Sequence, residues 1–445
     1  MVQLFEKVNQ FVWGGPALLL ILVAGIIVTV RTKFVQFRLF PKAMRNLMQK
    51  ICNKESSSRR ALCTALAATV GTGNLAGVAG AIAIGGPGAV FWMWISAILG
   101  MGLKFAEATL SVQYRSVNAK GELVGGPMYI ICNALGKKWR WLACVYSFFG
   151  VAAAFGVGNA TQINTLVGSV NAVLTECGVQ TNRTINFLIG IILAVLLGLI
   201  LLGGVGRIGA AAEGLVPFAA ALYFLMSAGV LIIRFDMIPT AFASIFCGAF
   251  KPSAVTGGIV GSVFQTLRIG VSRGVFTNEA GMGTAGIAHA GAKVKKSAEQ
   301  GLMGIVEVFL DTIVICTLTA LVILCSGVGI PYGQDCGITL TANAFLRVYG
   351  EWSQVLLMLS VCCFAFATVL GWGLYGNRCA QYLLGERAWR PIALLQMAVV
   401  VLGAILETKS VWILSEIVNG LMVIPALIVM IVLAPKMRPL IKEIC

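Results

Sequence analysis

Apolar runs about 20 residues long recur along the whole chain, and short polar segments that carry most of the charge separate them. A run of this length crosses roughly 30 Å of hydrocarbon as a helix. Because the first run follows no basic segment and precedes no small-residue cleavage site, we expect a retained span and not a signal peptide. The pattern predicts one transmembrane domain over 1–445 with eleven spans, at 15–30, 61–84, 89–114, 141–172, 185–203, 214–233, 258–287, 301–326, 353–375, 391–406 and 411–433.

Two of these spans contain glycine and polar residues in mid-helix, at 68–74 (ATVGTGN, the first break) and at 276–284 (FTNEAGMGT, the second break). Irregular backbone inside a membrane is tolerated only where protein or a water-filled cavity satisfies it, so both breaks indicate function. Glycines that only let helices pack closely are the alternative. Inverted-repeat transporters interrupt corresponding helices in their two halves. Here the breaks begin two runs of five spans, 61–233 and 258–433, which predicts an all-α five-plus-five repeat after an extra helix at 15–30.

Composition and charge placement both favour a membrane protein. Hydrophobic residues make up 58% of the chain and charged residues 11%, which excludes a water-soluble surface. The net charge of +16 is unevenly placed: alternate loops hold 24 Lys/Arg against six Asp/Glu, whereas the opposite loops hold six of each. The positive-inside rule therefore predicts an external N-terminus and a cytoplasmic C-terminus. The basic stretch 31–60 is expected to lie against anionic lipid, so the charge does not indicate nucleic-acid binding.

The chemistry of an enzyme or a metal centre is hard to assemble from this sequence. There are thirteen Cys, mostly inside spans, and one His, His289, at the inner end of a span. A membrane-embedded enzyme would need a nucleophile with a base, or a metal cluster. A channel usually repeats one filter motif around an axis. Cys177 and Cys336 lie in predicted outer loops, but a disulfide between them is not favoured.

Two interrupted helices near the membrane midplane would expose free N–H groups at one half-helix start and free C=O groups at another half-helix end. The N–H groups suit a carboxylate and the C=O groups suit an ammonium, so the pattern predicts a site for a zwitterion such as an amino acid.

The segment 85–100, GGPGAVFWMWISAILG, resembles the signature of the alanine/glycine:cation symporter family. The resemblance implies a LeuT-type fold in the bacterial inner membrane that takes up alanine or glycine with Na⁺, or less often with a proton. It implies no cofactor and no obligate protein partner beyond the lipid bilayer. In one departure, Ala367 precedes Thr368 where the family often has two hydroxyl residues. Further resemblance lies in VGTGNLAGVA (70–79), KFAEATL (104–110), GGPMYI (125–130), VFTNEAGMG (275–283), FLDTIVICT (309–317) and FATVLGWGLYG (366–376).

For the substrate carboxylate we expect the backbone amides of Gly73 and Asn74, with the Thr72 hydroxyl as a further donor. Gln162 belongs to a polar patch that resembles the family's, and it either reaches the substrate or links helices.

For the ammonium we expect the carbonyls around Phe276 and Thr277, with the Asn278 side chain and Gly281 in the same break.

The resemblance also implies a sodium site between the first break and the span at 353–375. Sodium prefers oxygen ligands, and an unwound turn supplies carbonyls without a buried carboxylate. By analogy with sodium-coupled neurotransmitter transporters, the expected ligands are the carbonyls of Ala67, Val70 and Ala365 and the hydroxyl of Thr368.

Charged residues within spans are costly, so each needs a partner or a function. We expect ion pairing for most of them, with gating and proton relay as alternatives. Glu307 and Asp311 share a helix face, and Arg268 or Arg273 is expected to supply their cation. If coupling is to protons, Glu279, Asp311 and Lys104 are the candidates. The charged residues in spans are Lys104, Glu107, Arg268, Arg273, Glu279, Glu307, Asp311 and Glu416.

Overall fold

The computed structural model describes residues 2–52, 57–406 and 408–444, so part of the basic stretch, 53–56, lies outside the described residues. Two short strands, β1 (Ser116–Val117) and β2 (Leu123–Val124), pair as an antiparallel hairpin. The helices before residue 234, with short π or 3-10 turns marked η, are α1 (Val2–Gly14), α2 (Pro16–Arg31), α3 (Val35–Arg38), α4 (Phe40–Cys52), α5 (Ser57–Thr69), η1 (Gly73–Gly77), α6 (Val78–Gly85), α7 (Ala89–Gln113), α8 (Pro127–Ile130), η2 (Ile131–Leu135), η3 (Lys137–Trp139), α9 (Arg140–Phe155), η4 (Gly156–Ala160), α10 (Thr161–Glu176), α11 (Arg183–Leu201) and α12 (Val205–Ile233).

The second part of the chain is equally helical. Its elements are η5 (Phe235–Met237), α13 (Ile238–Phe250), α14 (Pro252–Thr256), α15 (Val263–Asn278), α16 (Thr284–His289), α17 (Ser297–Val308), η6 (Phe309–Cys316), α18 (Thr317–Cys325), α19 (Thr339–Tyr349), α20 (Trp352–Leu384), η7 (Glu386–Ala388), α21 (Trp389–Ile405), α22 (Thr408–Leu433), η8 (Ala434–Lys436) and α23 (Met437–Lys442).

Nine helices in the described part of the chain are long and apolar enough to cross a membrane. A tenth is added if α5 and the η1–α6 helix, which meet at a bend of 48°, form one span. The span predicted at 258–287 is divided into α15 and the short α16. The predicted total of eleven therefore remains a prediction, while the membrane class follows from the nine apolar helices.

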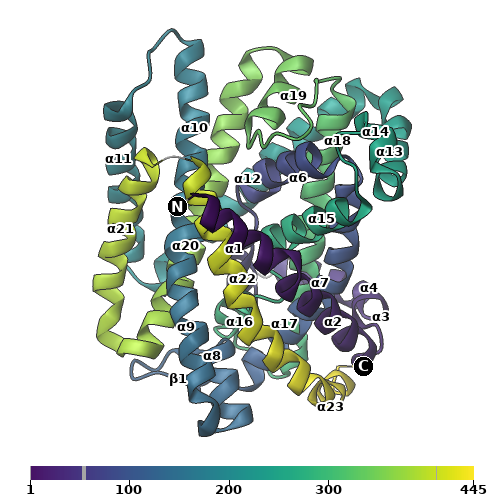
Figure 1. Ribbon diagram of the computed structural model, residues 1–445. Helices are drawn as coiled ribbons and strands as arrows, with labels where there is room; N and C mark the ends of the chain where they lie inside the picture. The colour runs from purple at the N-terminus through teal and green to yellow at the C-terminus, as the bar shows by residue number, and fades with distance from the viewer. Residues whose placement is uncertain (1, 53–56, 407, 445) are drawn as a thin grey trace.

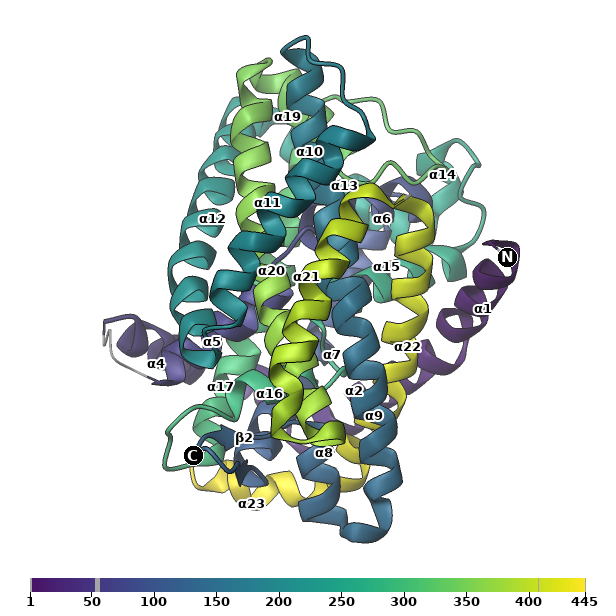
Figure 2. The ribbon, with the colours of Figure 1, turned by 90° about the vertical axis from the view of Figure 1, so that its left-hand side faces the viewer.

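The broken helices lie in the middle of the bundle (Figures 1 and 2). The long α7 packs against α15 and α17, and α20 packs against α9, α12 and α5. The pair α11 and α21 stands to one side with its own small apolar core shared with α10 and α20. Both breaks are thus enclosed by helices on all sides, as irregular backbone in a membrane requires.

The loops sort to two ends of the molecule. The β1–β2 hairpin, α8 and α23 gather at the lower end in Figures 1 and 2, whereas α14, α19 and the turn between α10 and α11 lie at the upper end. These are the two groups that the charge bias separates into inner and outer loops. The lower end is therefore the basic end.

Several elements differ from the predicted ranges. The helix predicted at 214–233 begins earlier, at Val205, and the one predicted at 353–375 continues to Leu384. The apolar pattern stops where basic residues such as Arg207 and Arg378 begin, although the helical backbone continues past them. Helices α1, α4, α13 and α19 lie in segments that were predicted as loops. Cys177 and Cys336 are free thiols in the structure.

Candidate functional site

The first break opens because side chains take N–H groups away from the helix. In a continuous helix the N–H of Gly71 would donate to the carbonyl of Ala67. Here it donates to Oδ1 of Asn74 at 2.9 Å. The next N–H, that of Thr72, donates to Oε1 of Gln162 at 3.2 Å. The carbonyls of Ala67 and Ala68 therefore lose their usual helical partners.

The second break opens through its backbone conformation. Glu279, Gly281 and Gly283 all have positive φ, at 54°, 91° and 77°. The N–H of Ala280 donates to Oδ1 of Asn278 at 2.9 Å, where a continuous helix would use the carbonyl of Phe276. The last turn of α15 thus also presents carbonyls without helical partners.

The two breaks face each other at close range. Gly73 lies against α15, and a Cβ added to it would be 3.3 Å from the Phe276 ring and 3.4 Å from Cγ2 of Thr277. Such distances are tight for a real Cβ, so glycine allows this approach. The expected carboxylate side (Gly73) and the expected ammonium side (Phe276 and Thr277) are therefore neighbours.

Asp311 in η6 connects the two breaks, a contact that sequence reasoning missed. Nδ2 of Asn74 donates to Oδ1 of Asp311 at 2.6 Å. The Thr312 hydroxyl donates to Oδ2 of Asp311 at 2.8 Å and accepts from Nδ2 of Asn278 at 3.0 Å. The carboxylate is fully buried, and among the described residues no Lys or Arg forms an ion pair with it. An acidic side chain followed by Thr in mid-span was the only signal in the sequence.

Gln162 makes a link between helices at the first break. Its Oε1 accepts from the Thr72 hydroxyl at 2.8 Å in addition to the Thr72 N–H, and its Nε2 donates to the Val157 carbonyl at 3.1 Å. The side chain is buried, so it ties α10 to the start of η1. Its position at the break is compatible with both roles considered above.

Thr368 on α20 lies directly beside the first break. A Cβ added to Gly71 would be 2.5 Å from the Thr368 hydroxyl oxygen. That oxygen is buried and has no hydrogen-bond partner among the described residues. A buried hydroxyl without a partner is costly, and a bound cation would satisfy it. The residues present therefore fit a sodium ion, with Val70 and the freed carbonyl of Ala67 on the facing turn.

Ala365, one turn before Thr368, lies inside the unbroken helix α20 and is fully buried. In an unbroken helix the Ala365 carbonyl already accepts a hydrogen bond from a helical N–H. It can bind a cation in addition, because a carbonyl oxygen has two lone pairs. Ala367, at the position where the resembled family often has a hydroxyl, is apolar and also buried.

Aromatic and charged side chains close the upper side of the site. The Phe276 ring stacks on Trp412, with centroids 5.2 Å apart, and the Arg273 guanidinium lies 5.6 Å from the Trp412 centroid. Arg273 pairs with Glu416 at 3.0 Å and with Asp335 at 3.4 Å. These contacts join α15 to α22 and to the loop before α19.

The expectation that Arg268 or Arg273 neutralises Glu307 and Asp311 is wrong. The cation is Lys104, whose Nζ lies 2.7 Å from Oε1 of Glu307, and both side chains are fully buried. Arg273 instead pairs with Glu416 and Asp335 at the upper side of the site. Helices α7 and α17 pack side by side, so a residue distant in sequence supplies the charge.

The other buried acids of this region bind helix ends and neighbouring donors. Oε1 of Glu107 accepts from the Gly281 N–H at 2.6 Å. Glu279 accepts from Nε1 of Trp372 at 2.6 Å and from the Thr284 hydroxyl at 2.7 Å. They therefore hold the second break in its left-handed conformation.

Below the breaks, a cavity of about 460 Å³ opens at the basic end between α5, α12, α16 and α20. Thr64, Ile287 and Arg378 are among its lining residues. Glu213 of α12 pairs with Arg59 and Arg60 of α5 at 3.2 and 3.4 Å beside it. Side chains thus cover the upper side of the site, and a cavity opens at the basic end of the same bundle.

Comparison with known proteins agrees with this geometry. Residues 1–444 match the sequence model of the sodium:alanine symporter family. The chain is 40% identical to the sodium/alanine symporter AgcS of Methanococcus maripaludis, over 97% of this chain and 95% of that protein. It is 34% identical to the probable sodium/glutamine symporter GlnT of Bacillus subtilis, over 100% and 91%.

Among solved structures, MhsT in complex with L-phenylalanine aligns with a TM-score of 0.58 at 12% identity, covering 86% of this chain and 97% of that one. At this identity the likeness concerns the fold alone, which is that of LeuT-type transporters. With a family match from end to end and relatives at 40% identity, the chain belongs to the sodium:alanine symporter family.

Proposed function

We propose that this symporter carries alanine or glycine into the cell together with Na⁺ by alternating access, binding both at the two facing breaks. The observation that carries the proposal is the pair of asparagines, Asn74 and Asn278. Each takes an N–H group from its own helix, which leaves unpaired carbonyls on both sides of the Gly73–Phe276 contact. Carbonyls on the two sides suit two cations, the substrate ammonium and Na⁺, while the N–H groups at the start of η1 suit the substrate carboxylate.

In this proposal the substrate carboxylate binds at the start of η1, to the N–H groups of Gly73 and Asn74 and the Thr72 hydroxyl. The Asn74 N–H donates to the Gly71 carbonyl at 3.3 Å and the Thr72 hydroxyl donates to Gln162 at 2.8 Å, so both donors must turn to the carboxylate when the substrate binds. Helix starts favour anions because their first N–H groups have no partner in a preceding turn. Gln162 positions Thr72 through its two hydrogen bonds.

The substrate ammonium binds at the end of α15, to the carbonyls of Phe276 and Thr277, beside Asn278 and Gly281. Helix ends favour cations because their last carbonyls have no N–H partner in a following turn. The fully buried Asp311 is linked to this side through Thr312, whose hydroxyl donates to Asp311 and accepts from Nδ2 of Asn278.

The sodium ion binds beside the substrate, to the Thr368 hydroxyl and to the carbonyls of Ala67, Val70 and Ala365. The Thr368 hydroxyl, which has no hydrogen-bond partner within the described ranges, lies close to Gly71, and both observations support this assignment. An ion that bridges α20 and the first break would stabilise the arrangement in which substrate binds, which couples the two.

Coupling to protons is the alternative, and Asp311, Glu279 and Lys104 remain its candidate groups. The experiment that separates the two is uptake of labelled alanine in proteoliposomes, with Na⁺ replaced by choline and with or without an imposed pH gradient. Sodium coupling predicts that uptake stops in choline whatever the pH gradient. Uptake that persists in choline and follows the pH gradient would contradict it.

We also propose eleven spans arranged as an extra helix (15–30) and two five-span repeats (61–233 and 258–433), in a bacterial inner membrane. The N-terminus is external and the C-terminus cytoplasmic, as the charge bias of the loops favours. Single-cysteine labelling in a Cys-less background tests this. A cysteine at Lys295 should react with an impermeant reagent only after permeabilisation, and labelling of intact cells would contradict the topology.

A further inference from the structure

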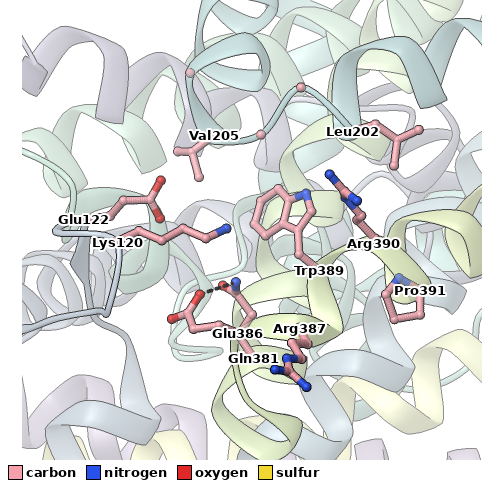
Figure 3. A pocket seen from close by; sticks show the side chains of 13 residues that line it. Lys120, Glu122, Leu202, Val205, Gln381, Glu386, Arg387, Trp389, Arg390 and Pro391 are labelled. Atoms are coloured by element: carbon pink, nitrogen blue, oxygen red, sulfur yellow. Dashed lines mark hydrogen bonds between the residues drawn. The ribbon is translucent and has the colours of Figure 1, made fainter.

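A second and larger cavity, of about 810 Å³, lies at the basic end, and no residue of the two breaks lines it. Figure 3 shows the cavity from close by. Three connections meet there: the β1–β2 turn, the loop between α11 and α12, and the loop between α20 and α21. Its charged and aromatic lining residues are Lys120, Glu122, Glu386, Arg387, Trp389 and Arg390.

The cations that line this cavity are not held in salt bridges by any residue that the structure describes. Among the described residues, Lys120, Arg387 and Arg390 form no ion pair. Glu122 is already engaged, because Arg378 contacts it at 2.8 Å. Partial burial raises the pKa of the Glu122 carboxyl, but the Arg378 guanidinium, with smaller contributions from Asn118 and the Lys120 ammonium, outweighs this and holds the pKa below its usual value.

The other acid is engaged as well. Glu386 accepts from Nε2 of Gln381 at 2.9 Å, below the Trp389 ring in Figure 3. The side chains of Lys120 and Arg390 lie on either side of that ring (Figure 3). The cavity therefore presents two cations around an aromatic surface, with both carboxylates directed to other partners.

The cavity adjoins the apolar outer surface of the bundle. Large side chains on α11 and α21 point outward, and Leu199 is 63% exposed and Leu394 54% exposed. In a membrane such side chains face acyl chains. Trp389, which donates to the Leu201 carbonyl at 3.1 Å, lies where the polar cavity meets this surface, the usual depth of tryptophan in a bilayer.

We propose that this cavity binds an anionic phospholipid, with the phosphate between Lys120 and Arg390 and the acyl chains along α11 and α21. Cationic pockets between helices on the cytoplasmic side suit anionic headgroups, and the assignment of this end to the cytoplasm rests on the topology proposed above. A free phosphate has the same chemistry as the headgroup. Only a ligand with acyl chains, however, would also contact the exposed leucines beside the cavity.

Lipid binding to the purified protein in detergent tests the proposal. Phosphatidylglycerol and phosphatidylcholine with identical acyl chains are titrated without Na⁺ or alanine, and bound lipid is counted by native mass spectrometry while the melting temperature is followed. Phosphatidylglycerol should bind more tightly than phosphatidylcholine and raise the melting temperature more. In the double variant K120Q/R390Q its affinity should fall about 25-fold, at roughly fivefold per cation near the headgroups.

The matched control is K137Q/K138Q, which also removes two exposed cations from the basic end, on η3. It should bind phosphatidylglycerol as the parent does. An equal loss in the control would mean general attraction to the charged surface and would overturn the proposal. Equal stabilisation of the parent by inorganic phosphate, or equal binding of the two lipids, would overturn it too. Since neither Na⁺ nor alanine is present, failure here leaves the proposed transport untouched.

Discussion

Between α5 and η1 no residue has a positive φ, whereas three of the five residues between α15 and α16 do. The first break is held open by side chains from other helices, above all Gln162, and by Asn74. The second break is held open by its own left-handed backbone, with Glu107 bound to the Gly281 N–H. Equivalent openings in two helices thus depend on different interactions, and different substitutions should close them.

The largest effect is expected from Gly283→Ala in the second break. The new Cβ would lie 2.2 Å from Cγ of Pro127, at a φ of 77°. A left-handed non-glycine residue costs about 1–2 kcal/mol and overpacking about 1–3 kcal/mol, so the sum is roughly 2–5 kcal/mol. Alanine uptake in proteoliposomes should be abolished, and the melting temperature in detergent should fall.

The matched control is Gly77→Ala at the first break, where φ is −67° and the nearest atom, Cγ2 of Thr277, is 3.8 Å away. This variant should transport as the parent does. If the two variants behaved alike, the second break would not depend on its left-handed backbone.

The next effect is expected from Asn74→Ala, which removes the acceptor of the Gly71 N–H and a donor to Asp311. Leaving a buried polar group unpaired costs about 1–3 kcal/mol. Two such groups cost at least about 2 kcal/mol, so the KM for alanine should rise about 30-fold or more.

Asn278→Ala should be milder, because the glycines of the second break persist without it. The KM of each variant is measured from labelled alanine uptake at several alanine concentrations, and the two values are compared. A larger rise in KM for Asn278→Ala than for Asn74→Ala would reverse the assignment of side-chain and backbone control.

Thr368→Ala should weaken sodium more than substrate. Losing one neutral oxygen ligand costs about 1–3 kcal/mol, or roughly five- to 150-fold in sodium affinity. Thr368→Ser keeps the oxygen and should behave nearly as the parent. The sodium affinity is measured from alanine uptake at several sodium concentrations and fixed pH. An unchanged sodium dependence in Thr368→Ala would show that this residue is not part of the sodium site.

The smallest effect concerns the substrate side chain. Because Gly73 and Phe276 are in close contact between the breaks, a larger side chain must displace the Phe276 ring. We expect leucine to inhibit labelled alanine uptake about tenfold less than glycine does, corresponding to about 1.4 kcal/mol of crowding. Equal inhibition by the two amino acids would show that the breaks separate more easily than their contact suggests.

Much of the fold could be predicted from the sequence, because the membrane constrains the length and composition of each segment separately. Apolar run length predicted the membrane class and the positions of most long helices, and charge in the loops sorted them into two groups that lie at opposite ends. Glycine, threonine and asparagine in mid-hydrocarbon located both breaks, since only irregular backbone requires them there. The family match and the LeuT-type fold agree with what the segment at 85–100 implied.

Only the tertiary structure decided which residues become partners across helices. Glu307 pairs with Lys104 and not with an arginine, and Asp311 joins the two breaks. The Thr368 hydroxyl lies beside Gly71 and has no hydrogen-bond partner in the described part of the chain. The local sequence pattern predicts the spacing of residues along one helix, at about 1.5 Å per residue. It does not record the rotation of that helix about its axis or the identity of the helix packed against it, and these set every contact between side chains in the site.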